Sequence, residues 1–322
     1  MLPTNVKATL IGLCAPICWG TNVGFARAIA EQFGRSVGYA IMYGIAFCGL
    51  LALFGRPKFS DYPLKYLIFG LGAAVASAFC FIQSLAFSHG GIETVQVGMI
   101  NYMWPCLTVI FGMLFNGQRG RWWVAVGFLL CIIGIVMVLS GDRGFDVGLF
   151  INNWRQNPLS YWLAVAAALT WAGYSSMTRA WAGGKNSVVM IFFLDWMMFV
   201  GLSLFTAGPV TEINWTGGLG WLSILLCATF TSTGYASWNY GMMKGNMTLL
   251  AIFSYMTPVI SAAFSSWWIH ASLTWGFAKG VMLVVIGSLV CWMATLNMPP
   301  KKPNVVKLPK ADEEPTESQK AA

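Results

Sequence analysis

Ten long apolar segments, separated by short polar connections, constrain the fold of this 322-residue chain more than any other feature. A bilayer core about 30 Å thick requires about 20 predominantly apolar residues for each helix that crosses it. Each segment has about this length, and their approximate bounds are 8–28, 37–55, 64–87, 92–115, 121–140, 158–181, 187–207, 216–241, 247–268 and 273–297. The sequence therefore predicts an all-α membrane protein with ten transmembrane helices.

The composition excludes several classes of protein. Charged residues make up 9% of the chain, whereas an average soluble domain contains about 25%. The basic residues are distributed between the apolar segments and form no single patch, so we do not expect a nucleic acid partner. The two His residues lie far apart, and no pair of membrane acids shares a helix face. We therefore predict no enzyme activity, no metal and no cofactor.

The distribution of Lys and Arg predicts the orientation of the chain. If the N-terminus is cytoplasmic, 14 of the 19 Lys and Arg residues fall on the cytoplasmic side. Positive charge is retained in the cytoplasm, so both termini are predicted to be cytoplasmic. Residues 299–322 are rich in Lys, Pro and Glu and contain too few apolar side chains to fold alone. We predict a disordered cytoplasmic tail there.

Two sequence features each occur a second time, about 150 residues later in the chain. Trp19 is matched by Trp171, 152 residues later. The pattern Asn-Tyr-Met-Trp-Pro at 101–105 is matched by Ser-Tyr-Met-Thr-Pro at 254–258, 153 residues later. The two offsets differ by one residue, so the sequence predicts an internal repeat.

The predicted repeat unit contains five helices. Because five is odd, the second copy must lie upside down in the membrane relative to the first. We therefore predict two inverted five-helix repeats, at 1–145 and 146–298. Inverted repeats favour a transporter that alternates between inward-open and outward-open shapes around a midplane site. A duplication retained for structural reasons alone is the alternative.

Four stretches resemble one transporter family, and they are Lys-Ala-Thr-Leu-Ile-Gly-Leu at 7–13, Val-Gly-Met-Ile-Asn-Tyr-Met-Trp-Pro at 97–105, Phe-Asn-Gly-Gln at 115–118 and Pro-Leu-Ser-Tyr at 158–161. Over residues 7–297 the chain resembles the drug/metabolite transporter superfamily, specifically its ten-helix EamA-type members. Within these it is most similar to the YddG-type aromatic amino acid exporters. The resemblance implies a bacterial inner-membrane protein that exports Phe, Tyr, Trp and related aromatic compounds. The alternative is a broad-specificity drug or metabolite efflux protein coupled to protons.

Aromatic and small polar side chains on the predicted helices are candidates for binding such a solute. Trp and Tyr rings can stack on an aromatic solute, while amide and hydroxyl groups can bind its ammonium and carboxylate. The candidates are Trp19, Asn22, Phe81, Ser84, Asn101, Tyr102, Trp171, Tyr174, Ser175, Tyr235, Asn239, Ser254 and Tyr255. For any single aromatic residue, contact with lipid or anchoring at the membrane interface is the alternative. The expected partners are a small-molecule substrate and the lipid bilayer, with the protein a monomer or a weak homodimer.

Two prolines occupy matching positions in the repeat. Proline lacks a backbone donor and clashes with the preceding turn, so Pro105 and Pro258 should each kink a membrane helix. We predict that they are hinges beside the transport pathway. The alternative is a tolerated kink within ordinary packing of small residues.

Ionisable residues are rare inside the predicted spans. Asp195 lies about eight residues into its segment, or about 12 Å at 1.5 Å per residue, and therefore close to the midplane. A charge at this depth costs at least about 2.5 kcal/mol, so the carboxyl group should be protonated, paired or facing water. Asp195 is the candidate for proton coupling, and a neutral Asp hydrogen-bonded between helices is the alternative. The pair Gly276 and Gly280 could pack against another helix of the chain or form a dimer.

Overall fold

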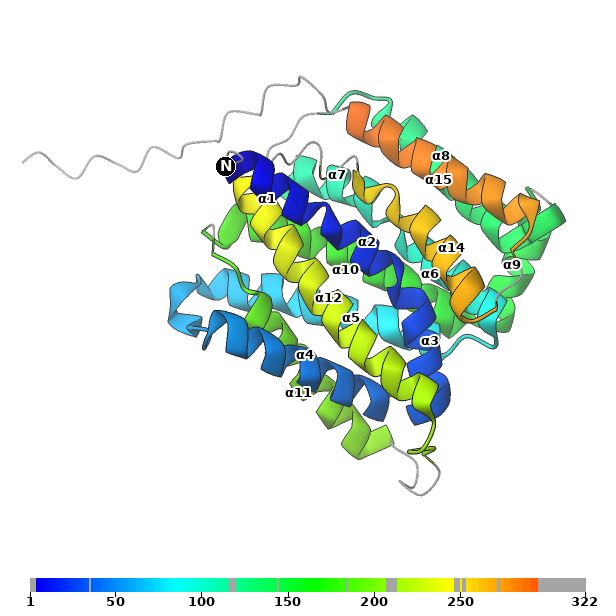
Figure 1. Cartoon of the computed structure of the whole chain (residues 1–322). Coiled ribbons are helices and arrows are strands. Elements are labelled where there is room, and N and C mark those ends of the chain that lie inside the picture. Colours follow the sequence, from blue (N-terminus) through cyan, green and yellow to red (C-terminus); the bar gives the residue numbers. More distant parts are fainter. Residues whose placement is uncertain are drawn as a thin grey trace, which may run out of the picture.

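The structure is a computed structural model that describes residues 4–34, 36–115, 120–143, 145–183, 185–206, 213–245, 250, 253–270 and 273–294. Throughout these ranges the regular secondary structure is helical, and they contain no strand (Figure 1). The predicted tail at 299–322 lies outside the described residues.

The first half of the chain contains long helices that match the first five apolar segments. Segment 8–28 becomes three consecutive helices, and segment 92–115 becomes two. The elements are α1 (Thr4–Gly12), α2 (Cys14–Gly20), α3 (Asn22–Phe33), α4 (Val37–Phe54), η1 (Phe59–Asp61), η2 (Tyr66–Gly70), α5 (Leu71–Ala86), α6 (Gly91–Asn101), α7 (Trp104–Phe115), α8 (Val124–Ser140) and η3 (Gly141–Arg143).

The second half begins with a short helix that hydropathy did not predict. This helix, α9 (Val147–Gln156), contains Asn, Arg and Gln and starts at Asp146, whose side chain accepts a hydrogen bond from the Leu149 amide at 2.9 Å. Such an N-cap satisfies one of the free donors at a helix start. The elements that follow are α10 (Pro158–Trp181), α11 (Val188–Thr206), α12 (Gly218–Lys244), α14 (Thr257–Trp268) and α15 (Trp275–Met293).

Seven helical segments are long and apolar enough to cross a membrane, and an eighth span is the pair Val6–Gly20 and Asn22–Phe33, bent by 41°. The two other predicted spans correspond to α10 and α14. Helix α10 has 24 residues, but its Trp, Tyr, Ser and Thr side chains lower its hydropathy, and α14 has 12 residues. The chain is a multi-pass helical membrane protein with seven or eight spans recognisable by length and composition.

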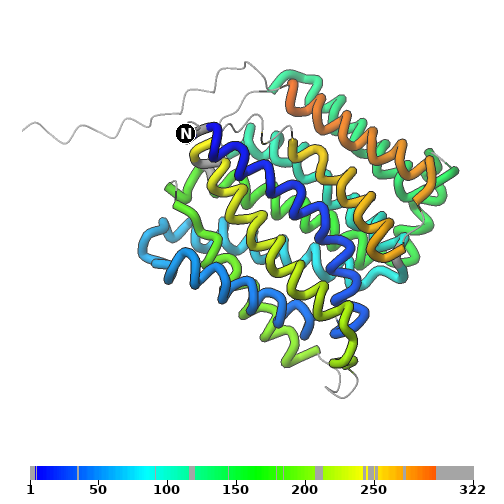
Figure 2. The backbone as a smooth tube through the Cα atoms, viewed as in Figure 1, coloured from blue at the N-terminus to red at the C-terminus, as the bar shows by residue number. Residues whose placement is uncertain are grey.

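Most helices pack against a partner far away in the sequence. Helix α8 packs along α15, α5 along α10, and α4 along α11. The bent first span, α1 to α3, runs beside α12, and α14 lies against α2 and α3 (Figure 2). The first apolar segment thus packs on the eighth, and the third packs on the sixth.

Two turns interrupt the fourth and ninth apolar segments just before the predicted hinge prolines. Between α6 and α7 the chain turns at residues 102–103, and before α14 it turns at 255–256. Pro105 and Pro258 are then the second residues of α7 and α14. A proline near a helix start loses no hydrogen bond, because the first amides of a helix have no partner within it. The structure thus contains matching breaks where the prolines predicted kinks.

Backbone contact between glycines joins α8 to α15. A Cβ atom added to Gly127 would lie 2.5 Å from the carbonyl oxygen of Gly287, and one added to Gly280 would lie 2.7 Å from the carbonyl oxygen of Gly134. We call these four glycines the glycine seam. Small residues allow such close approach of membrane helices. Gly276 packs against η3 in the same way, so both glycines of the predicted pair pack inside the chain.

Candidate functional site

A cavity of about 80 Å³ lies between the central helices. Helices from both halves of the chain contribute to its wall. The lining residues are Trp19, Asn22, Met42, Tyr43, Ser77, Ala78, Phe81, Ile82, Asn101, Tyr102, Trp104, Trp171, Cys227, Thr231, Tyr235 and Thr257. None of these side chains is an acid or a base with a formal charge at neutral pH.

Indole and phenol rings form one continuous part of this wall. The Trp19 ring lies 5.7 Å from the Trp171 ring and 5.6 Å from the Tyr235 ring, with interplanar angles of 82° and 77°. The Trp171 and Tyr235 rings are 5.2 Å apart, and Trp104 meets Trp171 at 6.1 Å. Edge-to-face pairs of this kind hold aromatic rings in fixed orientations. We call these four residues the aromatic wall.

Three buried polar atoms of the lining residues lack a hydrogen-bond partner among the described residues. They are the indole nitrogen Nε1 of Trp19, the amide oxygen Oδ1 of Asn101 and the hydroxyl oxygen Oγ1 of Thr257. An unpaired buried polar group costs about 1–3 kcal/mol, so such groups are suited to a ligand that satisfies them. The indole N–H and the hydroxyl can donate to a carboxylate, and the amide oxygen can accept from an ammonium group.

A further hydrogen bond in the cavity joins the two halves of the chain. The Thr231 hydroxyl on α12 donates to the amide oxygen Oδ1 of Asn22 on α3 over 3.0 Å. Asn22 is the first residue of α3, directly after the bend between α2 and α3. Trp19 lies just before this bend, near the end of α2. This bond fixes the bent first span against α12 at the level of the cavity.

Seven of the thirteen predicted binding residues line this cavity, and they are Trp19, Asn22, Phe81, Asn101, Tyr102, Trp171 and Tyr235. The structure thus brings together candidates that are as far apart in the sequence as Trp19 and Tyr235.

The other six candidates lie outside the cavity wall. The Ser84 hydroxyl donates to the carbonyl oxygen of Phe81 within α5, and the Asn239 amide donates to the side chain of Asn186 at 2.7 Å. The Tyr174 ring packs on the Trp171 ring at 5.3 Å but is not among the lining residues. Ser175 is half-buried, whereas Ser254 and Tyr255 are buried at the break before α14.

Several lining residues were not among the sequence candidates. Ser77 lies one turn before Phe81, and Trp104 lies three residues after Asn101, so helical spacing could have identified both. Thr257 lies 153 residues after Trp104, at the offset of the predicted repeat. Met42 and Tyr43 of α4 carry no such signal, because the second apolar segment was not expected to reach the cavity.

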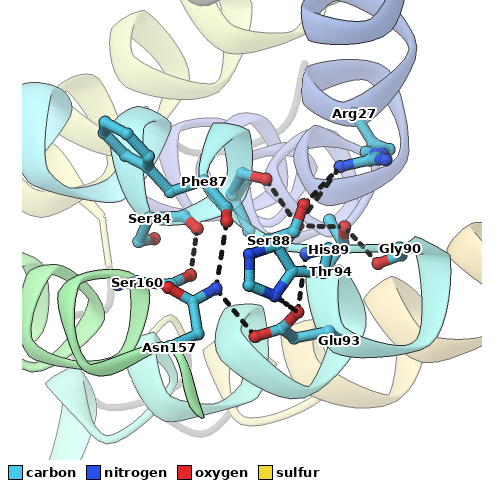
Figure 3. Close-up of polar contacts among 11 residues, drawn as sticks. Arg27, Ser84, Phe87, Ser88, His89, Gly90, Glu93, Thr94, Asn157 and Ser160 are labelled. Carbon is cyan, nitrogen blue, oxygen red and sulfur yellow. Dashed lines mark hydrogen bonds and ion pairs between the residues drawn. The ribbon is translucent and has the colours of Figure 1, made fainter.

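A polar cluster holds the connection between α5 and α6 against two other helices (Figure 3). The Arg27 guanidinium donates to the Ser88 carbonyl oxygen at 2.8 Å, and the hydroxyls of Ser88 and Thr94 are hydrogen-bonded to each other. The Asn157 amide donates to the Glu93 carboxylate at 2.9 Å. These bonds join α3 and the start of α10 to the start of α6, at one end of the helices that form the cavity.

Asp195, the candidate for coupling, lies in α11 and outside the cavity wall. Its side chain is 1% exposed, and its carboxyl oxygen Oδ1 has no hydrogen-bond partner among the described residues. The alternative was a neutral Asp hydrogen-bonded between helices. Within the described part of the chain, Oδ1 has no partner for such a bond.

Comparison of the sequence with known proteins identifies the family of this chain. The model of the EamA-like transporter family matches residues 6–140 and again residues 158–293. The chain belongs to this family. The chain also shares its fold with a solved crystal structure at 20% sequence identity, with a TM-score of 0.60 over 91% of this chain and 100% of that one.

Two curated relatives of known name are similar over almost their whole length. The aromatic amino acid exporter YddG of Escherichia coli (strain K12) is 38% identical over 298 residues, which cover 91% of this chain and 99% of the relative. The aromatic amino acid exporter YddG of Salmonella typhimurium is 37% identical over 295 residues, with the same coverage of both chains.

Proposed function

We propose that this chain exports aromatic amino acids, namely Phe, Tyr, Trp and related aromatic compounds, from the cytoplasm across the inner membrane. The observation that carries the proposal is a cavity lined by the aromatic wall, with unpartnered polar atoms on the lining residues Trp19, Asn101 and Thr257. The names of the two relatives at 37–38% identity support the same substrate class.

The chemistry of the cavity matches the parts of an aromatic amino acid. Each edge-to-face contact between rings contributes about 0.5–1.5 kcal/mol beyond the burial of apolar area, so the aromatic wall favours an aromatic side chain. The donors at Trp19 and Thr257 suit the carboxylate, and the Asn101 oxygen suits the ammonium group. A zwitterion has no net charge, and none of the lining residues is charged. A carboxylate in the cavity wall would favour the alternative substrate, a cationic drug. Asp195 is not part of the wall, because it lies behind the lining residues.

The size of the cavity supports a proposal about the conformation of the protein in this structure. A volume of about 80 Å³ is smaller than the roughly 300–1,000 Å³ of typical ligand pockets. We propose that the cavity is contracted here and that the substrate binds a wider conformation. The two conformations would be stages of one transport cycle.

Alternating access between two inverted halves, 1–145 and 146–298, is the proposed mechanism. The family model matches the chain twice, once in each half. The packing of α12 on the first span is matched by that of α5 on α10, as expected if the halves are related by symmetry. The breaks before Pro105 and Pro258 supply matching points at which the halves could bend. Broken helices at a midplane site are typical of such transporters.

Contacts between the connections support the proposed topology of ten spans with both termini in the cytoplasm. Lys185 pairs with Asp61 at 3.5 Å, and the Arg121 amide donates to the Ala294 carbonyl oxygen at 3.0 Å. The first contact joins two connections predicted to be cytoplasmic, and the second joins two predicted spans at their cytoplasmic ends. The Gln32 amide donates to the carbonyl oxygen of Gly217 at 2.6 Å, which joins a connection predicted to be periplasmic to the predicted periplasmic end of the eighth span.

Uptake of labelled Phe, Trp and Lys into liposomes containing the purified protein tests the proposed function. We expect saturable uptake of Phe and Trp and no uptake of Lys above that of protein-free liposomes. Uptake of none of the aromatic amino acids by a folded protein would refute the proposed substrate. Folding would be checked by a cooperative thermal transition of the same preparation.

A further inference from the structure

One face of α11 connects Asp195 to the cavity. Phe192, Asp195 and Phe199 are spaced by three and four residues and therefore lie on one face of the helix. The Tyr43 ring packs on this face, at 5.6 Å from the Phe192 ring and 5.2 Å from the Phe199 ring. The Tyr235 ring meets Phe192 at 5.3 Å. Both tyrosines line the cavity, so they separate Asp195 from it.

Helix α11 packs against α4, α5 and α12, and none of these helices contains Arg or His. The titratable side chains on the three helices are Tyr39, Tyr43 and Cys48 on α4, Cys80 on α5, and Cys227, Tyr235, Tyr240 and Lys244 on α12. Lys244 is the last residue of α12, nine residues beyond Tyr235, and therefore about 13 Å further along the helix.

The carboxyl group is therefore buried in an apolar region without a basic partner on the helices that surround it. A charged carboxylate is strongly disfavoured in such surroundings, so the group holds a proton while the cavity is contracted. In a wider conformation, water in the cavity would reach the two tyrosines and could accept the proton. The protonation of Asp195 and the width of the cavity are then linked, because each state of the carboxyl group favours one conformation.

We infer that Asp195 binds the proton that couples amino acid export to proton entry, and that it exchanges this proton with the cavity through Tyr43 and Tyr235. This inference rests on the proposed function. In each transfer the carboxyl group gives its proton to a tyrosine oxygen, and that tyrosine releases its own hydroxyl proton to water in the cavity. The tyrosine stays neutral overall, and the carboxylate later takes up a proton by the reverse route. One proton enters for each amino acid that leaves.

The experiment compares two kinds of transport by the same liposomes. Exchange of labelled for unlabelled Phe at equal pH needs no net proton movement. Accumulation of labelled Phe in vesicles that are more acidic inside than outside needs coupling. For exchange of one proton per amino acid, a gradient of about one pH unit sustains about a tenfold accumulation.

We expect wild-type protein to show both activities. Asp195→Asn should keep exchange and lose accumulation, whereas Asp61→Asn, at an exposed ion pair, should keep both. The double variant Tyr43→Phe, Tyr235→Phe should accumulate more slowly at an unchanged final level. Accumulation by Asp195→Asn at the wild-type level would overturn the inference.

Other outcomes separate this inference from the proposed function. Wild-type protein that exchanges Phe but ignores the pH gradient would overturn the inference and leave the proposed function intact. Protein that exchanges no aromatic amino acid would refute the proposed function. If Asp195→Asn loses exchange as well, the exchange rate of Asp195→Glu is measured as a function of pH. A midpoint of this pH profile that is shifted from that of the wild type supports the inference. A midpoint equal to that of the wild type overturns it.

Discussion

The glycine seam between α8 and α15 and the cavity at the centre of the molecule are built in opposite ways. Along the glycine seam, backbones approach so closely that Gly127 and Gly280 have no room for a Cβ atom. In the cavity, large rings leave a space, and polar atoms of Trp19, Asn101 and Thr257 have no partner among the described residues. A region packed to the backbone is suited to staying rigid. A region with free volume and unpaired donors is suited to binding and to changing shape.

The largest expected effect is on stability, from Gly127→Leu in the glycine seam. A Cβ atom there would lie 2.5 Å from the Gly287 carbonyl oxygen and 2.7 Å from the Cys291 amide nitrogen, so α8 and α15 would have to separate. Overpacking usually costs about 1–3 kcal/mol, and we expect a loss near or above about 3 kcal/mol because the obstacle is backbone. The midpoint of thermal unfolding in detergent measures it.

Gly49→Leu on α4 is the matched control for the glycine seam. A Cβ atom at this position has no neighbour within 4 Å. Replacing a helical glycine removes backbone freedom from the unfolded chain, so stability should stay equal or rise by up to about 1 kcal/mol. Equal melting temperatures for the two variants would contradict the rigid role of the glycine seam.

The next largest effect is expected on substrate affinity, from Trp171→Ala in the aromatic wall. This change removes the ring contacts of Trp171 with Trp19, Trp104 and Tyr235. It also removes the part of the aromatic surface that Trp171 offers to the substrate. Loss of two ring contacts to the substrate, at about 0.5–1.5 kcal/mol each, would weaken Phe binding by about 5-fold to 150-fold. The concentration of Phe that gives half-maximal exchange measures the change. The control is Trp275→Ala, whose ring is 82% exposed, and an equal loss there would contradict the role of the aromatic wall.

An effect of similar size but greater selectivity is expected from Thr257→Val. Valine has nearly the same shape but lacks the hydroxyl that we assign to the substrate carboxylate. A hydrogen bond to a charged group contributes about 1.5–3 kcal/mol, so Phe should bind at least about tenfold more weakly. Competition by phenylethylamine, which has no carboxylate, should be unchanged. Equal weakening for both compounds would show that Thr257 does not contact the carboxylate.

The smallest effect is expected on transport rate, from Pro105→Ala and Pro258→Ala. Both prolines are at helix starts next to a break, so their removal should stiffen the break without altering the cavity wall. We expect a rate decrease below about tenfold, or less than about 1.4 kcal/mol in the barrier, with unchanged affinity for Phe. Initial rates of exchange would show this. Wild-type rates in both variants would refute the hinge assignment.

The sequence predicted the helices better than it predicted the cavity. Hydropathy located the long apolar segments because lipid imposes one requirement on each of them separately. The breaks before Pro105 and Pro258 were predictable because proline acts within its own turn. The low hydropathy of α10 and the division of segment 8–28 at Thr21 depend instead on neighbouring helices, which a single segment does not describe.

The cavity depends on which helix faces meet in space. Trp19, Trp171 and Tyr235 were predicted because aromatic and polar residues share their helical faces. Ser84 had the same local pattern, yet its hydroxyl is bonded within α5. Tyr43 was not predicted, because nothing in the second apolar segment shows that α4 reaches the centre. A helical face is readable from spacing, but its neighbour is determined by tertiary packing.

Equilibrium binding of labelled Phe to the purified protein tests the central claim most directly. We expect saturable binding that unlabelled Trp and Tyr displace and that Lys does not, with the affinity reduced by both Trp171→Ala and Thr257→Val. No saturable binding, or displacement by Lys as effective as that by Trp, would contradict the claim that this cavity is built for aromatic amino acids.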